Sequence, residues 1–202
     1  MNIGFYKFAR VLIKGILAVI HPVKVHGAEN IPSEGPAIVC GNHISLRDPF
    51  IVAVCMKPEL RFMGKKELWD VKILRPILDA VGGFPVDRGA SDISALRTSI
   101  NILKEQQILG IFPEGTRNAA DGQQHAIQSG VASIALRGKA KLIPIYIQGP
   151  YKLFRPIHIT FGKPLDYSSH EGRIDRAAID RATEEIGSAI WSLSGALPEG
   201  KN

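Results

Sequence analysis

Residues 37–50 read AIVCGNHISLRDPF, and this stretch determines which kind of fold the chain is expected to form. Its first four residues, Ala37 to Cys40, are apolar, which is typical of a short buried strand. A second apolar run, from Phe50 to Met56, follows and is consistent with a helix. Pro49 suits the first turn of such a helix, and Asp48 is then its expected N-cap. The stretch therefore predicts a strand, a loop and a helix in succession, which is the repeating unit of an α/β protein.

The loop between this strand and this helix carries two ionisable side chains, His43 and Asp48, five positions apart. A turn from strand to helix lets the two side chains approach each other. In an α/β sheet, groups at the carboxyl ends of strands usually line the ligand site. A histidine held by a carboxylate can serve as a general base near neutral pH. Taken alone, such a pair is more often structural. Cys40 continues the apolar strand and is expected in the core.

The rest of the chain alternates between apolar runs and helical patterns. We expect strands at 23–25, 60–64, 108–112, 142–147 and 157–161, and helices at 69–81, 92–107, 129–137 and 173–193. The helical pattern at 69–81 is interrupted or restarted at Pro76. Ser91 is the expected cap of the helix at 92–107, whose inward face should carry Ile93, Leu96, Ile100 and Leu103. This alternation predicts one α/β domain, residues 22–197, with a mixed, largely parallel β-sheet flanked by helices. Residues 198–202 are expected to be a disordered tail.

The composition limits the classes of function. Of 202 residues, 45% are hydrophobic and 22% are charged, as in ordinary globular proteins. The net charge of +6 favours an anionic partner: a phosphate, a nucleic acid or an acidic membrane. Two cysteines in apolar surroundings argue against a disulfide framework and suit a reducing compartment. The chain has no Cys-x-x-Cys or His-Glu-x-x-His spacing, so we expect no metal site.

Residues 1–21 form a segment of their own, which is largely apolar and carries three cations, Lys7, Arg10 and Lys14. On a helix these three cations share one face. The uncharged run after Lys14 is shorter than the roughly 20 residues needed to cross a bilayer. The pattern predicts an amphipathic helix associated with an anionic membrane surface. A helix packed on the protein's own core fits the pattern equally well.

Charged residues also follow two other apolar runs, in loops that contain glycine or proline: Arg88 comes after Phe84 to Val86, and Glu114 and Arg117 come after the expected strand at 108–112. Because loops at one sheet edge converge, these groups and the His43–Asp48 pair could line one pocket. The two guanidinium groups could clamp a phosphate, and Gly115 would let the backbone approach a ligand closely. Taken one by one, these charges are more often surface ion pairs.

Together, however, the motifs resemble those of the glycerolipid acyltransferases. The chain contains Asn42-His43-x-x-x-x-Asp48, then Gly83-Phe84-Pro85-Val86-Asp87-Arg88, then Phe112-Pro113-Glu114-Gly115-Thr116-Arg117, and then Ile143-Pro144-Ile145. They follow the family's order and extend over about residues 23–165. The resemblance implies that His43 and Asp48 are catalytic. It also implies that a glycerophosphate is bound by Arg88, Glu114, Gly115, Thr116 and Arg117.

The resemblance further implies acyl transfer from a thioester, acyl-CoA or acyl-carrier protein, to the free hydroxyl of 1-acyl-sn-glycerol-3-phosphate (lysophosphatidic acid), giving phosphatidic acid. His43 would take the proton from that hydroxyl, and no cofactor or metal would be needed. The enzyme would work at the cytoplasmic face of the cell membrane as a peripheral or monotopic protein. One departure is that residues 127–130, Ile-Gln-Ser-Gly, lack a lysine that such proteins often carry. Another lysolipid acceptor therefore stays open.

Two other classes of function compete with acyl transfer. A non-enzymatic basic module that binds anionic membranes would explain the charge and the first helix, but not the ordered motifs. The chain lacks an aromatic-rich basic strand, so no nucleic-acid partner is expected. A hydrolase that uses the His–Asp pair on water would release free fatty acid in place of an acylated lipid.

Overall fold

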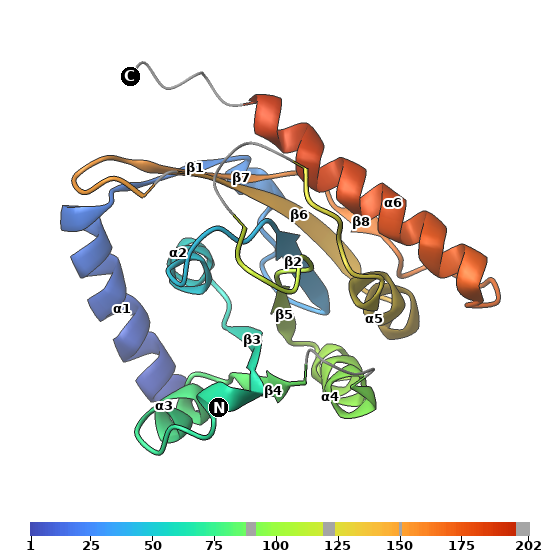
Figure 1. Cartoon of the computed structure of the whole chain (residues 1–202), viewed down its shortest axis with the longest axis horizontal. Helices are drawn as coiled ribbons and strands as arrows, with labels where there is room; N and C mark the ends of the chain where they lie inside the picture. Colours follow the sequence, from blue (N-terminus) through green and yellow to red (C-terminus); the bar gives the residue numbers. More distant parts are fainter. Residues whose placement is uncertain (88–91, 119–123, 150, 197–202) are drawn as a thin grey trace.

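The structure, a computed structural model, describes residues 1–87, 92–118, 124–149 and 151–196 (Figure 1). At its centre is an eight-stranded sheet with the order β1-β7-β6-β2-β5-β3-β4, in which β8 pairs with β6. The strands are β1 Val23–His26, β2 Ala37–Gly41, β3 Leu60–Lys65, β4 Phe84–Val86, β5 Ile108–Ile111, β6 Lys141–Gln148, β7 Ile157–Phe161 and β8 Leu165–Asp166. The helices are α1 Ile3–Ile20, α2 Asp48–Cys55, α3 Leu74–Ala80, α4 Ile93–Lys104, α5 Gly130–Gly138 and α6 Arg176–Ser192.

The direction of the strands places several loops at one sheet edge. Strand β2 pairs in parallel with β5 and with β6, and β3 pairs in parallel with β5 and β4. The carboxyl ends of these five strands therefore lie at the same edge. Strands β7 and β8 run antiparallel to β6, and β1 runs parallel to β7. The predicted mixed, largely parallel sheet is confirmed.

Strand β2 is buried on both faces, so it lies at the centre of the core. Ile38 and Cys40 belong to the cluster that packs under α4, α5 and α6. Ala37 and Val39 belong to the opposite cluster, under α1 and α2. In Figure 1 the two groups of helices lie on opposite sides of the sheet. Full burial of an aliphatic side chain contributes about 1.5–3 kcal/mol, so the end of β2 is a firmly held platform.

Several local expectations were wrong. Helix α3 begins at Leu74, not at residue 69, and Pro76 lies in its first turn, where a missing N–H costs nothing. Asp92 caps α4, and Ser91 lies outside the described residues. Ile93 is 61% exposed because this cap places it at the first helical position, away from the core. The short strands β4 and β8 were not expected from the sequence, since three and two residues are too few to show alternation.

Helix α1 packs against α2 with the buried side chains of Tyr6 and Leu17. Two of the three cations of α1 contact the body of the protein. Arg10 Nη1 donates to the carbonyl oxygens of Met56 and Lys57, and Lys7 Nζ lies 3.7 Å from Glu59 Oε1. The outward face is apolar and exposes Phe8, Val11, Leu12 and Val19. None of the described helices combines the length and apolar character that crossing a bilayer demands.

Candidate active site

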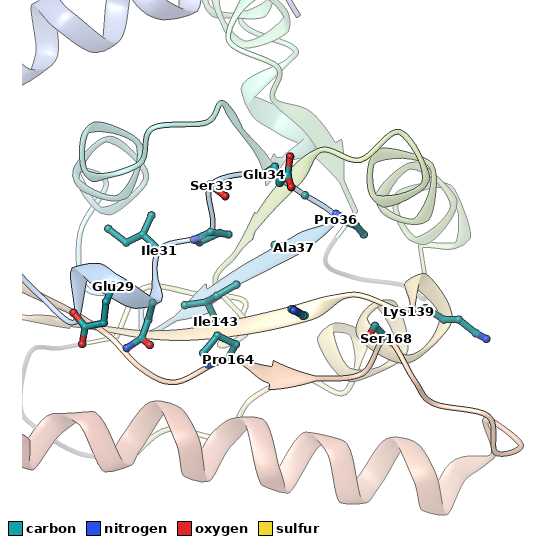
Figure 2. Close-up of a pocket in the computed structure, with 14 residues that line it drawn as sticks. Glu29, Ile31, Ser33, Glu34, Pro36, Ala37, Lys139, Ile143, Pro164 and Ser168 are labelled. Atoms are coloured by element: carbon teal, nitrogen blue, oxygen red, sulfur yellow. The ribbon is translucent and has the colours of Figure 1, made fainter.

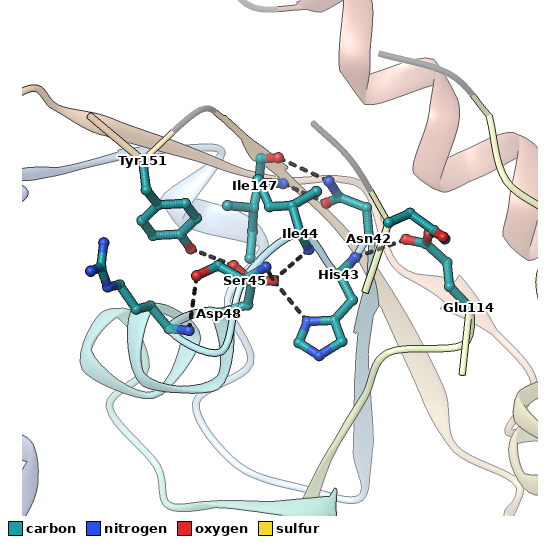
Figure 3. A network of polar contacts seen from close by, with 10 residues as sticks. Asn42, His43, Ile44, Ser45, Asp48, Glu114, Ile147 and Tyr151 are labelled. Carbon is teal, nitrogen blue, oxygen red and sulfur yellow. Dashed lines mark hydrogen bonds and ion pairs between the residues drawn. The ribbon is translucent and has the colours of Figure 1, made fainter. Parts of the chain in front are cut away.

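His43 follows the end of β2, and its ring lies against Asp48 (Figure 3). Its Nδ1 is 2.8 Å from Asp48 Oδ2. Because the carboxylate is the acceptor, the proton of a neutral ring lies on Nδ1, and Nε2 keeps a lone pair. The described residues give Nε2 no hydrogen-bond partner, and the ring stacks on Phe112 with centroids 4.4 Å apart. A histidine held in this way can act as a general base.

Asp48 is fully buried, and four donors surround its carboxylate. Besides His43, Oδ2 accepts from the main-chain N–H of Ile44 at 2.7 Å and of Ser45 at 2.8 Å. Oδ1 accepts from the hydroxyl of Tyr151. These donors offset the cost of burying the charge. The carboxylate thus points back to the loop that carries His43.

The prediction that Asp48 is the N-cap of α2 was wrong. Asp48 is the first residue of the helix, and Arg47, at the N-cap position, makes no side-chain capping bond. The physical reason is competition for the carboxylate: main-chain donors of residues 44 and 45 occupy the oxygen that could otherwise cap the helix. Pro49 lies in the first turn, as expected.

Asn42 ties the loop to the neighbouring strand. Its Nδ2 donates to the carbonyl oxygen of Ile147 at 2.9 Å, and its Oδ1 accepts from the main-chain N–H of Ile147 at 2.7 Å. The side-chain amide thereby continues the pairing of β2 with β6 past Gly41, where the strand ends. His43, the next residue, is positioned directly by the sheet.

Glu114 joins the loop after β5 to His43. Its Oε1 accepts from the main-chain N–H of His43 at 2.8 Å, and its Oε2 accepts from Asn118 Nδ2. The main-chain N–H of Asn118 in turn donates to the carbonyl oxygen of His43 at 2.9 Å. Glu114 is buried, and both carboxylate oxygens have partners within the protein. Direct contact of Glu114 with a ligand stays a prediction.

The other residues expected to bind substrate differ in their surroundings. Gly115 has φ +69°, and a Cβ there would lie 2.1 Å from Nε2 of Gln128, so its close neighbour is a side chain of this chain. Thr116 and Arg117 are exposed, in the same segment that contacts His43. Arg88 lies outside the described residues.

Two other features are separate from this site. Cys40 is fully buried, and burial raises the pKa of its thiol far above the usual range, so it is a core residue as expected. A cavity of about 480 Å³ lies at the opposite edge of the sheet (Figure 2). Its lining includes Glu34, Lys139 and Ala37, the first residue of β2, whereas His43 follows the last residue of that strand.

Sequence reasoning identified some of this site and missed the rest. The structure brings together His43, Asp48 and Glu114, as the converging loops predicted. It adds Asn42 and Tyr151, to which no role was assigned. Asn42 could have been noticed as a polar residue directly after a buried strand. Tyr151 gives no local signal, because only the pairing of β6 with β2 brings it near Asp48.

This chain is similar in sequence to known acyltransferases. The family model described as Acyltransferase matches residues 22–148. A 1-acyl-sn-glycerol-3-phosphate acyltransferase of Bacillus subtilis (strain 168) is 32% identical over 200 residues, covering 96% of this chain and 99% of the relative. The enzyme of the same name from Streptococcus pneumoniae is 31% identical over 173 residues, 81% of this chain and 64% of the relative. The crystal structure of the 1-acyl-sn-glycerophosphate (LPA) acyltransferase PlsC from Thermotoga maritima superposes with a TM-score of 0.71. It is 23% identical, and the match covers 97% of this chain and 80% of that one.

Proposed function

This chain belongs to the acyltransferase family, and we propose that it transfers an acyl chain from a thioester donor to the free hydroxyl of 1-acyl-sn-glycerol-3-phosphate, giving phosphatidic acid. The observation that carries the proposal is the pair formed by His43 Nδ1 and Asp48 Oδ2, 2.8 Å apart. The names of the relatives support the choice of acceptor.

In the proposed reaction the lipid hydroxyl is the nucleophile. Its oxygen attacks the thioester carbonyl while Nε2 of His43 takes the hydroxyl proton. Asp48 stabilises the imidazolium that forms and keeps Nε2 directed at the hydroxyl, as the aspartate does in Ser-His-Asp sites. The new C–O bond forms, the C–S bond breaks, and the proton passes from His43 to the departing thiolate. No side chain of the protein needs to be acylated.

The acceptor's phosphate is assigned to the segment after β5. Arg117 is exposed and makes no ion pair with any residue in the described part of the chain, so its donor fork is available to an anion. Thr116 and the main chain at Gly115 lie in the same segment, and Arg88 is assigned to this group by its motif. The contacts of Glu114 with His43 and Asn118 support a role in holding the segment against the base.

The donor is proposed to be acyl-CoA or acyl-carrier protein. Both carry a thioester, whose cleavage supplies the driving force for ester formation without a cofactor. Both leave a thiolate that can accept the proton held by His43. The described residues do not distinguish between the two donors, so a direct assay must choose.

We also propose that the enzyme docks on the cytoplasmic face of the cell membrane as a peripheral or monotopic protein. On the outward face of α1, Phe8 and Val11 are 66% and 70% exposed. Helix α3 contacts α1, and Ile73 and Ile77 at α3 are also exposed. Exposed apolar side chains on this scale are typical of a membrane contact. At the other end of α1, the N–H of Phe154 donates to the carbonyl oxygen of Ile20, which brings the apolar surface close to the loop that contacts Asp48.

The central test is an assay of the purified protein with a panel of lysolipids and both donors. We expect phosphatidic acid from 1-acyl-sn-glycerol-3-phosphate and little product from lysolipids without a phosphomonoester. His43→Ala should lower turnover by roughly 10²–10⁴-fold while the circular dichroism spectrum stays native. Near-normal turnover of this variant would reject the assignment of the base. Release of free fatty acid without acylated lipid would favour hydrolysis.

The membrane proposal is tested with a charge on the outward face of α1. Val11→Asp should reduce co-sedimentation with anionic vesicles several-fold, because a carboxylate replaces an exposed apolar side chain. Ile93→Asp is the matched control, since Ile93 is exposed to 61% but lies on α4. Equal vesicle binding by the two variants would exclude α1 as the docking surface.

A further inference from the structure

Tyr151 lies in the connection between β6 and β7, 103 residues from Asp48 along the chain, and its hydroxyl donates to Asp48 Oδ1 (Figure 3). The two carboxylate oxygens have different partners. Oδ2 accepts from His43, Ile44 and Ser45, whereas Tyr151 is the donor to Oδ1 among the described residues. Loss of this hydroxyl would leave one oxygen of a fully buried carboxylate without its donor.

The ring of Tyr151 is held from two sides. His21, the C-cap residue of α1, meets it edge-on with ring centroids 5.7 Å apart. The guanidinium of Arg47, at the N-cap position of α2, lies 5.7 Å from the ring centroid, and its Nη1 is 2.9 Å from Nε2 of His21. Elements far apart in the sequence therefore direct the hydroxyl at Asp48.

The hydroxyl stays protonated at the pH of catalysis. Burial raises the pKa of Tyr151 far above its ordinary value, and the negative charge of Asp48 raises it further. Tyr151 is therefore a permanent donor and never a competing base. The other titratable or charged groups around the pair and around Tyr151 are His21, Arg47, Cys55 and Glu114.

We propose that Tyr151 is a positioning residue for acyl transfer, which acts on His43 through Asp48. Its hydroxyl satisfies Oδ1, while the main-chain N–H groups of Ile44 and Ser45 hold Oδ2 toward Nδ1. The hydroxyl also withdraws part of the negative charge that Asp48 would otherwise present to the imidazole. The inference rests on the proposed role of His43 as the base.

Tyr151→Phe removes the hydroxyl and keeps the ring against His21 and Arg47. We expect kcat at neutral pH to fall by roughly tenfold, because a larger fraction of His43 is then protonated and unable to accept a proton, with KM for both substrates unchanged. We also expect the acid limb of kcat/KM to move to higher pH, because a carboxylate with one donor fewer stabilises the protonated imidazole more strongly.

Tyr167→Phe is the matched control, because it also removes a tyrosine hydroxyl that donates to a carboxylate, Glu185 Oε2 at 2.7 Å, away from His43. It should leave kcat and the acid limb at their wild-type values. If Tyr151 were merely structural, Tyr151→Phe would lower thermal stability, as Tyr167→Phe would, and would leave the acid limb in place. An acid limb of Tyr151→Phe that stays in place or moves to lower pH would overturn the proposal.

A second measurement needs no substrate. Histidine-labelled protein can be titrated by NMR, with the His43 signal assigned from His43→Ala. Tyr151→Phe should move the titration of His43 to higher pH and leave that of His158 unchanged. An unmoved His43 titration contradicts the positioning role. If the signal moves although His43→Ala keeps full turnover, the contact is real and the proposed base is wrong.

Discussion

Helices α2 and α4 each have an aspartate at their start, and the two carboxylates do opposite things. At α4, Asp92 occupies the N-cap position and accepts from the main-chain N–H of Ala95 at 2.9 Å, in the same helix. At α2, Asp48 turns away from its helix and accepts from His43 and from the loop before it. Asp92 is partly exposed, whereas Asp48 is fully buried.

The difference teaches how this chain separates stability from function. Asp92 provides capping energy to α4, a contribution of about 1 kcal/mol for a typical N-cap. Helix α2 starts without a side-chain cap, and Pro49 in its first turn supplies part of the missing support. Helix α2 thus lacks a side-chain cap, and the buried carboxylate contacts His43 in its place.

The largest effect on the contrast between Asp48 and Asp92 is expected from Asp48→Asn. The amide can keep its oxygen toward the N–H groups of Ile44 and Ser45, so the loop is retained and only the charge is lost. We expect kcat to fall by roughly 10²–10⁴-fold, since the imidazolium loses its counter-charge. The measurement is steady-state kinetics with circular dichroism on the same sample. A variant that keeps wild-type kcat would place Asp48 with the structural carboxylates.

A smaller effect is expected from Arg117→Ala, which removes a charge that has no fixed partner within the described residues. KM for the acceptor should rise by about tenfold with kcat nearly unchanged, because a phosphate is held equally in the ground and transition states. Arg117→Lys should recover part of the affinity, since it restores the charge without the fork. If KM does not change, the acceptor's phosphate lies elsewhere.

The smallest effect is expected at the other aspartate. Asp92→Ala should lower the free energy of unfolding by about 1 kcal/mol at pH 7 and leave kcat unchanged. Hydrogen bonds from the N–H of Asp87, the hydroxyl of Ser94 and the N–H of Ala95 lower the pKa of Asp92 from 3.8 to about 2.

Because the folded-state pKa lies below the unfolded value, this stabilisation is complete above about pH 5 and is lost as the pH falls toward 2. Urea unfolding of wild type and Asp92→Ala at pH 7, 5, 4 and 3 should therefore give curves that converge at low pH. A constant difference across this range would show that the carboxylate charge is not what caps α4.

The same comparison shows what the sequence could and could not predict. The apolar runs predicted six of the described strands, including β2, β3, β5 and β6 with their common edge, because burial decides them. The sequence could not show where each aspartate points: Asp48 and Asp92 both precede helical patterns, and main-chain donors 3–4 residues away decide the outcome for Asp48. Tyr151, which contacts Asp48 from the loop after β6, depends on which strands become neighbours. No local pattern encodes that order.

The side-chain amide of Asn42 has a consequence for how the enzyme can change over time. Since this amide pairs with Ile147 as a further strand residue would, the imidazole beside it moves with the interior of the sheet and not with the surface. Loops that do not contact His43 or Asp48 can then be exchanged or lengthened while the pair stays in place. New acceptors and donors thus become accessible to selection, and to protein engineers, through grafted loops on an unaltered catalytic platform.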